Sequence, residues 1–190
     1  MAYRNMIRKG VEDRMSEIRD KNGLTEAEYL KTYDPGNWKT PSLTADICIV
    51  SYKDNEKRIL LIRRGNHPYL GKWALPGGFS EEGERIEETA ARELMEETGI
   101  SMRPEDLTLV GIYSKPGRDP RGWTVSAAYL AVVDPDKVKP IAADDADDVG
   151  WFTIIRVQDS ILLKNEKEVL TMEDLAFDHR EIIADALKKV

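Results

Sequence analysis

The stretch from Trp73 to Ile100, WALPGGFSEEGERIEETAARELMEETGI, is the most informative part of this 190-residue chain. The segment 84–98 within it contains neither proline nor internal glycine. Ile86, Ala90 and Leu94 recur at intervals of four residues, which predicts a helix with one apolar stripe. Gly99 follows at the position where helices favour a left-handed residue. The stretch therefore predicts a glycine-rich turn leading into a helix of about four turns.

Three carboxylates fall on one side of this helix. Glu93, Glu96 and Glu97 are related by spacings of three and four residues, so they project together. Carboxylates this close repel one another, and a divalent cation removes that penalty. Oxygen ligands favour magnesium, manganese or calcium over zinc, and magnesium shares its coordination with phosphate oxygens. The pattern predicts a Mg²⁺ site, with Mn²⁺ as the alternative ion.

The glycines and the arginine of this stretch have predictable roles. Gly77 and Gly78 allow a tight turn whose backbone approaches a metal or a phosphate. Arg92 keeps its charge and bridges carboxylates with two nitrogens, so we expect it to orient Glu96 or Glu88. A glutamate-rich helix is more often just a solvated face. The full spacing argues against that alternative, because a chance match is on the order of one in a million.

The pattern G-x5-E-x7-R-E-L-x-E-E-x-G-I, which runs from Gly78 to Ile100, resembles the signature of the Nudix hydrolases at every defined position. That family cleaves nucleoside diphosphates linked to another group, by attack of water on phosphorus with help from a divalent metal. The resemblance implies that Glu93, Glu96 and Glu97 hold the metal and that the Gly77 carbonyl adds a ligand. Glu93 is alternatively the general base, because family members differ on that point.

The rest of the chain predicts an α/β protein. Strands are expected at 45–52, 57–64, 107–115, 124–133 and 149–153, with a hairpin turn at 53–56 and short strands at 161–164 and 169–171. A closing helix is expected after Asp178, which forms a cap pattern with Glu181. The Nudix resemblance sharpens this to an α/β/α sandwich with a mixed β-sheet over residues 43–190.

An N-terminal helical arm is expected over residues 1–42. A charged helix is predicted at 1–22, and the pattern from Thr25 to Glu28 predicts a capping box that opens a second, short helix. This arm lies outside the signature stretch. A homodimer is a further expectation, based on the resembling subfamily and on the arm.

Composition excludes several classes of protein. The net charge is −7 and the chain has no large basic block, which argues against a nucleic-acid coat or a binder of anionic membranes. A single cysteine, Cys48, lies in an apolar run and is expected to be buried. Two histidines, His67 and His179, make a zinc site or a serine-histidine-aspartate triad improbable. No apolar run reaches membrane-spanning length, so a cytoplasmic protein is expected.

Several further residues are candidates for substrate contact. The loop 114–123 carries Arg118, Arg121 and Trp123, which suit a phosphate and a stacked base, although a solvated loop with the tryptophan in the core fits equally well. Arg64, Trp73 and Gly78 flank or form the glycine turn and are further candidates for substrate contact. Related enzymes use a carboxylate from a late loop as ligand or base, which implies Asp145 in the acidic run 144–148.

The expected substrate is ADP-ribose, cleaved to AMP and ribose 5-phosphate. The runs 119–122 and 175–179 resemble Nudix enzymes of the ADP-ribose pyrophosphatase type and their transcription-regulator relatives. Three other hypotheses stay open: a Nudix hydrolase of damaged nucleoside triphosphates or dinucleotides, a nucleotide-binding regulator without turnover, and a small interaction protein. We expect the regulator to need a DNA-binding domain after the terminal helix, for which few residues follow.

Overall fold

The computed structural model describes residues 18–134 and 146–190, but not the side chains of residues 146 and 147. The chain divides into two compact units, Met1–Thr40 and Pro41–Val190. The helices and 3-10 turns are α2 (Glu26–Thr32), η1 (Pro35–Asn37), α3 (Ile86–Thr98), η2 (Pro104–Asp106), η3 (Met172–Asp174) and α4 (His179–Ala186). The strands are β1 (Ser42–Lys53), β2 (Glu56–Arg64), β3 (Trp73–Ala74), β4 (Gly77–Phe79), β5 (Thr108–Tyr113), β6 (Thr124–Val133), β7 (Ala146–Val157), β8 (Ser160–Lys164) and β9 (Val169–Thr171).

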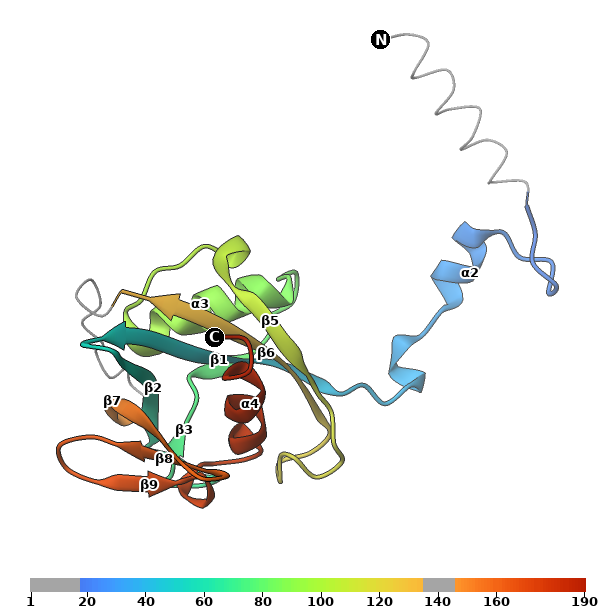
Figure 1. Ribbon diagram of the computed structural model, residues 1–190. Coiled ribbons are helices and arrows are strands. Elements are labelled where there is room, and N and C mark those ends of the chain that lie inside the picture. The colour runs from blue at the N-terminus through green and yellow to red at the C-terminus, as the bar shows by residue number, and fades with distance from the viewer. Residues whose placement is uncertain (1–17, 135–145) are drawn as a thin grey trace, which may run out of the picture. The chain divides into compact units, whose positions relative to one another are not determined.

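The described strands of the larger unit form one mixed sheet in the order β5-β6-β1-β2-β7-β8-β9, with β3 beside β2 and β4 beside β1 (Figure 1). The pair β1–β6 is parallel, whereas β1–β2, β2–β7 and β7–β8 are antiparallel. The turn between β1 and β2 places Asp54 and Asn55 at φ 52° and 63°, as a two-residue hairpin turn requires. The predicted hairpin is therefore confirmed.

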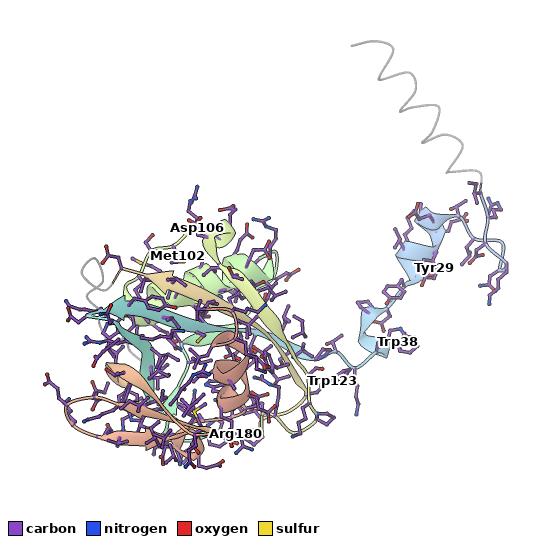
Figure 2. All side chains as sticks on the ribbon, in the orientation of Figure 1. Tyr29, Trp38, Met102, Asp106, Trp123 and Arg180 are labelled. Carbon is purple, nitrogen blue, oxygen red and sulfur yellow. The ribbon has the colours of Figure 1, made fainter. Side chains whose placement is uncertain are left out.

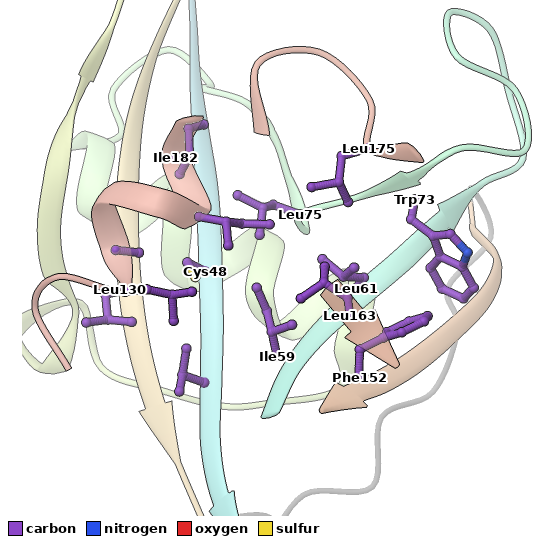
Figure 3. Close-up of a cluster of buried hydrophobic side chains, with 14 of the residues drawn as sticks. Cys48, Ile59, Leu61, Trp73, Leu75, Leu130, Phe152, Leu163, Leu175 and Ile182 are labelled. Carbon is purple, nitrogen blue, oxygen red and sulfur yellow. The ribbon is translucent and has the colours of Figure 1, made fainter. Parts of the chain in front are cut away.

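Side chains of β1 alternate between two apolar cores because successive residues of a strand face opposite sides of the sheet. Cys48 and Val50 pack with α4, β8 and β9 in one core, part of which is drawn in Figure 3. Ile47 and Ile49 pack with α3 in the other core. The predicted α/β/α layering with a mixed sheet is confirmed, and so is the burial of Cys48.

The smaller unit contains the capping box that the sequence predicts. Thr25 accepts from the backbone N–H of Glu28, and the Glu28 carboxylate accepts from the N–H of Thr25. Most of the helix predicted at 1–22 lies outside the described residues, and for residues 18–22 that prediction is wrong. Asp20 accepts from the N–H groups of Asn22 and Leu24, so its side chain stabilises a turn instead of a helix.

The C-terminal helix forms where expected, but its cap differs from the prediction. Asp178 stands at the N-cap and its carboxylate makes no capping bond. That carboxylate accepts instead from the Arg118 guanidinium, at 2.8 and 2.6 Å. Arg118 offers this carboxylate an opposite charge and two parallel bonds, whereas a cap offers a single bond from a neutral N–H group. None of the helices in the described part of the chain is long and apolar enough to cross a bilayer.

Candidate active site

Helix α3 presents its acidic face to a cavity and its apolar face to the sheet. Ala90 and Leu94 are fully buried against β1 and β6. The helix ends at Gly99, whose φ of 71° is the left-handed value predicted for it. Glu93 and Glu97 are four residues apart and so lie beside each other on the helix, and both line the cavity.

The glycine turn lies directly against these two carboxylates. Gly77 has φ +154°, and a Cβ there would lie 2.1 Å from the Ala45 carbonyl oxygen. The Gly77 N–H donates to Glu97 Oε2 at 2.7 Å. A Cβ on Gly78 would lie 2.4 Å from Glu93 Oε1. Gly77 is therefore required by the close approach of the Ala45 backbone, whereas a Cβ at Gly78 would displace the Glu93 carboxylate. The turn and the helix form one site.

Burial makes both carboxyl groups weaker acids than an exposed glutamate. It raises the pKa of Glu97 to about 8, and the negative charge of Glu93 adds to that effect, while the bond from the Gly77 N–H opposes it. Burial also raises the pKa of Glu93, against the lowering influence of Arg92 and with a further contribution from Glu96. Two neighbouring carboxyl groups with raised pKa values are typical of an acid–base or metal site.

Arg92 connects four oxygen-bearing groups around this site. Its guanidinium donates to Glu84 at 2.8 Å, to Glu93 at 2.7 Å, to Glu96 at 3.1 Å and to the Phe79 carbonyl at 2.9 Å. The predicted contact with Glu96 is confirmed. The alternative contact with Glu88 is wrong, because that carboxylate pairs with Arg85, the N-cap residue of the helix.

Glu96 is separated from the other two predicted metal ligands. Its side chain is 57% exposed and pairs with Arg92, and the described residues that line the cavity do not include it. Within the described chain, no three His, Cys, Asp or Glu side chains are already gathered as a metal site. Glu93 and Glu97 nevertheless fit a hard divalent cation. They are neighbouring oxygen donors, and their raised pKa values show that the surrounding residues do not fully stabilise two negative charges there.

The cavity has a volume of about 520 Å³ and combines these carboxylates with cationic and aromatic side chains. Arg64, Arg118 and Arg121 line it, together with Gly77 and Gly78. Arg64 faces the cavity while Arg63 bonds the Gly71 carbonyl outside it, as the alternation of strand side chains predicts. Arg92 lines the cavity as well, and four guanidinium groups around a carboxylate pair suit an anionic substrate.

A buried polar network forms one wall of the cavity, and sequence reasoning missed most of it. Arg118 is 8% exposed and pairs with Asp46 at 3.2 Å and with Asp178 at 2.6 Å. Ser126 donates to Asp46 at 2.6 Å, and the Leu75 N–H donates to His179 Nδ1 at 2.8 Å. The signal for Asp46 was a single acidic residue inside an otherwise apolar strand.

Two other predicted residues lie elsewhere, and a third is not among the described residues. Trp73 is 3% exposed and packs edge-on against Phe152 in the core, so the structure does not bring it to the cavity. Trp123 is 57% exposed, which excludes a core position for it (Figure 2). Asp145 lies outside the described residues.

Comparisons with known proteins agree with this geometry. The model of the NUDIX domain matches residues 42–174. An "ADP-ribose pyrophosphatase" from Methanocaldococcus jannaschii is 40% identical over 136 residues, 72% of this chain and 68% of the relative. An "ADPR responsive transcriptional repressor NtrR" from Acinetobacter baylyi is 31% identical over 89% of this chain, which spans only 62% of the repressor.

A solved structure shares the fold as well. The NUDIX domain of Shewanella oneidensis NrtR, crystallised with ADP ribose, aligns with a TM-score of 0.69 and 33% identity. The alignment covers 87% of this chain and 99% of that domain. With its signature helix, glycine turn and mixed sheet, the chain belongs to the Nudix family.

Proposed function

We propose that this protein hydrolyses ADP-ribose to AMP and ribose 5-phosphate. The observation that carries the proposal is the contact between the glycine turn and the Glu93–Glu97 pair, inside a cavity lined by four arginines. That arrangement suits a diphosphate, since arginines bind phosphate oxygens and carboxylates serve as ligands or bases. Similarity to a named ADP-ribose pyrophosphatase and to a domain crystallised with ADP ribose supports this substrate.

Nudix hydrolases use divalent metals, and for this chain we propose Mg²⁺, with Mn²⁺ as a substitute. Glu93 and Glu97 would hold the ion, with Glu96 and the Gly77 carbonyl as further donors. When bound, such an ion neutralises charge on the phosphate oxygens and acidifies water. Hard oxygen donors and raised carboxylate pKa values support this choice.

The chain's own residues supply positioning and proton transfer. We assign proton acceptance from the attacking water to the Glu93–Glu97 pair, because these carboxylates lie against the glycine turn at which the diphosphate would bind. Arg92 orients Glu93 through a 2.7 Å bond. Arg64 and Arg121 line the cavity and would hold diphosphate oxygens. Phosphoryl transfer requires mainly such positioning and charge stabilisation.

The test is turnover of ADP-ribose with MgCl₂ by purified protein, with products separated by ion-exchange chromatography. Equal amounts of AMP and ribose 5-phosphate are the expected result. NADH, diadenosine polyphosphates, nucleotide sugars and dNTPs provide the comparison panel. Faster release of pyrophosphate from a nucleoside triphosphate than of AMP from ADP-ribose would overturn the substrate assignment.

A second candidate function is that of an ADP-ribose-responsive regulator. It is favoured by the alignment with 99% of the NrtR domain crystallised with ADP ribose. Calorimetry separates the two candidates. Saturable ADP-ribose binding without any release of AMP would favour the regulator, whereas product formation at catalytic enzyme concentration would favour the hydrolase.

A further inference from the structure

The buried polar network of the cavity wall contains a hydrogen-bond donor and an acceptor that lie close together without bonding. His179 Nε2 is 3.6 Å from Asp46 Oδ1, which is too long for a hydrogen bond. Both residues line the cavity, although His179 is only 3% exposed and Asp46 only 8%. A hydroxyl group both donates and accepts, so it can bridge two such atoms. The pair is therefore a candidate site for a hydroxyl of a bound ligand.

The surrounding fold makes His179 Nε2 the donor of this pair. The other ring nitrogen, Nδ1, accepts from the Leu75 N–H at 2.8 Å, so the ring proton lies on Nε2. His179 is the first residue of α4, and the residue before it, Asp178, pairs with Arg118 at 2.6 Å. The direction of the donor is thus fixed before any ligand binds, so little side-chain freedom is lost on binding.

The carboxylate of Asp46 is held by only one of its two oxygens. Oδ2 accepts from Ser126 Oγ at 2.6 Å and from Arg118 Nη2 at 3.2 Å. Within the described part of the chain, Oδ1 accepts no hydrogen bond. A carboxylate oxygen has lone pairs for about two bonds, so Oδ1 keeps its capacity to accept from a ligand. Asp46 therefore supplies a rigid acceptor opposite the rigid donor of His179.

The charge of this wall favours a hydroxyl over a phosphate. The carboxylates of Asp46 and Asp178 flank a single guanidinium, that of Arg118. An anionic phosphate oxygen would be repelled by the carboxylate that carries Oδ1, whereas a hydroxyl donates a proton to it. The phosphates of a ligand are better placed at Arg64 and Arg121, which line the same cavity.

The donor–acceptor pair adjoins the glycine turn. Asp46 pairs with Gly77 between β1 and β4, and a Cβ on Gly77 would lie 2.9 Å from the Asp46 Cα. The diphosphate of ADP-ribose carries a ribose on either side, so ribose hydroxyls are the hydroxyls closest to a diphosphate at this turn. We infer that Asp46 and His179 form a subsite for one ribose hydroxyl of the substrate. This deepens and rests on the proposed function, because it adds a recognition site for the sugar to the diphosphate site.

The experiment measures how much affinity each ribose hydroxyl contributes. Calorimetry with MgCl₂ gives dissociation constants of the wild type for AMP, for ribose 5-phosphate and for analogues of each that lack one ribose hydroxyl. Loss of a hydrogen bond to a charged group costs about tenfold or more in affinity, so one analogue is expected to bind that much more weakly than its parent. A loss in the AMP series assigns the subsite to the nucleoside ribose, and a loss in the other series assigns it to the terminal ribose.

Two variants test the residues. His179→Asn keeps an acceptor for the Leu75 N–H and removes Nε2, and Asp46→Asn removes the charge of the acceptor. Each is expected to reduce the preference for the hydroxylated ligand by about fivefold or more. Tyr113→Phe is the control, because it removes a hydroxyl that donates to Asp185 on the same helix, and Tyr113 is not among the described residues that line the cavity. General loosening of α4 would weaken hydroxylated and deoxy ligands alike and leave the preference unchanged.

The inference is overturned if the wild type prefers no hydroxylated ligand, if both folded variants retain the preference, or if Tyr113→Phe loses it. Should neither variant fold, ¹⁵N NMR of the wild type decides, because the chain has only two histidines to assign. The Nε2 resonance of His179 is expected to shift with the hydroxylated ligand and to stay unchanged with its deoxy analogue. Equal shifts with both ligands would also overturn the inference.

ADP-ribose turnover, measured separately, distinguishes this inference from the proposed function. A hydroxyl preference that depends on Asp46 and His179, without turnover, would retain the subsite and refute the hydrolase. Turnover with a preference that neither variant affects would retain the hydrolase and refute the subsite.

Discussion

Glu97 combines three properties that few glutamates share. It lies on the cavity side of α3, accepts from the Gly77 N–H at 2.7 Å and has a pKa raised by burial to about 8. Neighbouring Glu96 has the same chemistry but is 57% exposed. The difference arises from one residue of helical rotation, about 100°. Position on the helix thus decides which of two adjacent glutamates faces the cavity.

Replacement of Glu97 by glutamine tests this assignment. The amide keeps the shape and removes the charge, so kcat is expected to fall by roughly two to five orders of magnitude. Steady-state kinetics on ADP-ribose measure the effect. Glu88→Gln is the matched control, because Glu88 lies on the same helix and pairs with Arg85. Turnover of Glu97→Gln close to that of the wild type would refute the role of Glu97.

Gly78 offers a test that changes no charge. An added Cβ would lie 2.4 Å from Glu93 Oε1, so alanine must displace that carboxylate. Misplacement of a reacting group by about 1 Å costs on the order of 10²-fold in rate. We expect Gly78→Ala to lose activity by that amount. Gly111→Ala is the control, because its Cβ would have no neighbour closer than 3.6 Å.

At the scale of elements, α3 and the β3–β4 turn depend on each other. The turn reaches the helix through the Gly77 N–H and through Arg92, which donates to the Phe79 carbonyl. Arg92 also bonds Glu84, in the loop before the helix, and holds the pKa of that carboxyl at about 2. These bonds therefore fix the acidic face of α3 against the glycine turn and against the loop before the helix.

The C-terminal end of α3 provides a prediction about stability. Gly99 has φ 71°, and an alanine there would adopt a left-handed conformation that costs about 1 kcal/mol. No atom lies within 4 Å of the added Cβ, so strain of the backbone is the whole expected effect. Urea unfolding of Gly99→Ala measures it. An unchanged free energy of unfolding would show that the helix does not end at this glycine in solution.

At the scale of the molecule, the Asp46–Arg118–Asp178 network joins β1, the loop 114–123 and the start of α4. Burial by itself would raise the pKa of Asp46, but His179, Ser126 and Arg118 outweigh burial and lower that pKa to about 2. A carboxyl whose pKa is lower in the folded state stabilises the fold above its unfolded pKa, near 3.8. That stabilisation is lost as the pH falls from about 4 to about 2.

Asp46→Asn isolates this contribution. The difference in unfolding free energy between the wild type and the variant is expected to shrink by about 2 kcal/mol as the pH falls from about 6 to about 2. Comparison of the two proteins cancels the other carboxyls. Chemical denaturation at several pH values provides the measurement, and a difference independent of pH would contradict the lowered pKa of Asp46.

Local patterns in the sequence determined most of the elements of this protein. The apolar stripe of α3, the left-handed Gly99, the β1–β2 hairpin and the capping box at Thr25 each depend on residues within a few positions of one another. Spacing along one helix likewise places Glu93 and Glu97 together. Such features follow from backbone geometry and need no partner from elsewhere in the chain.

Only the tertiary structure decided which polar side chains meet. Asp178 leaves its helix cap for Arg118, 60 residues away, and Phe177 adopts a strained φ beside Arg121 and Arg64. Trp73 turns into the core, although it stands beside the glycine turn in sequence. Contacts between distant segments depend on how the sheet orders its strands and on which charges are buried together. Those are properties of the packed fold, which no local pattern encodes.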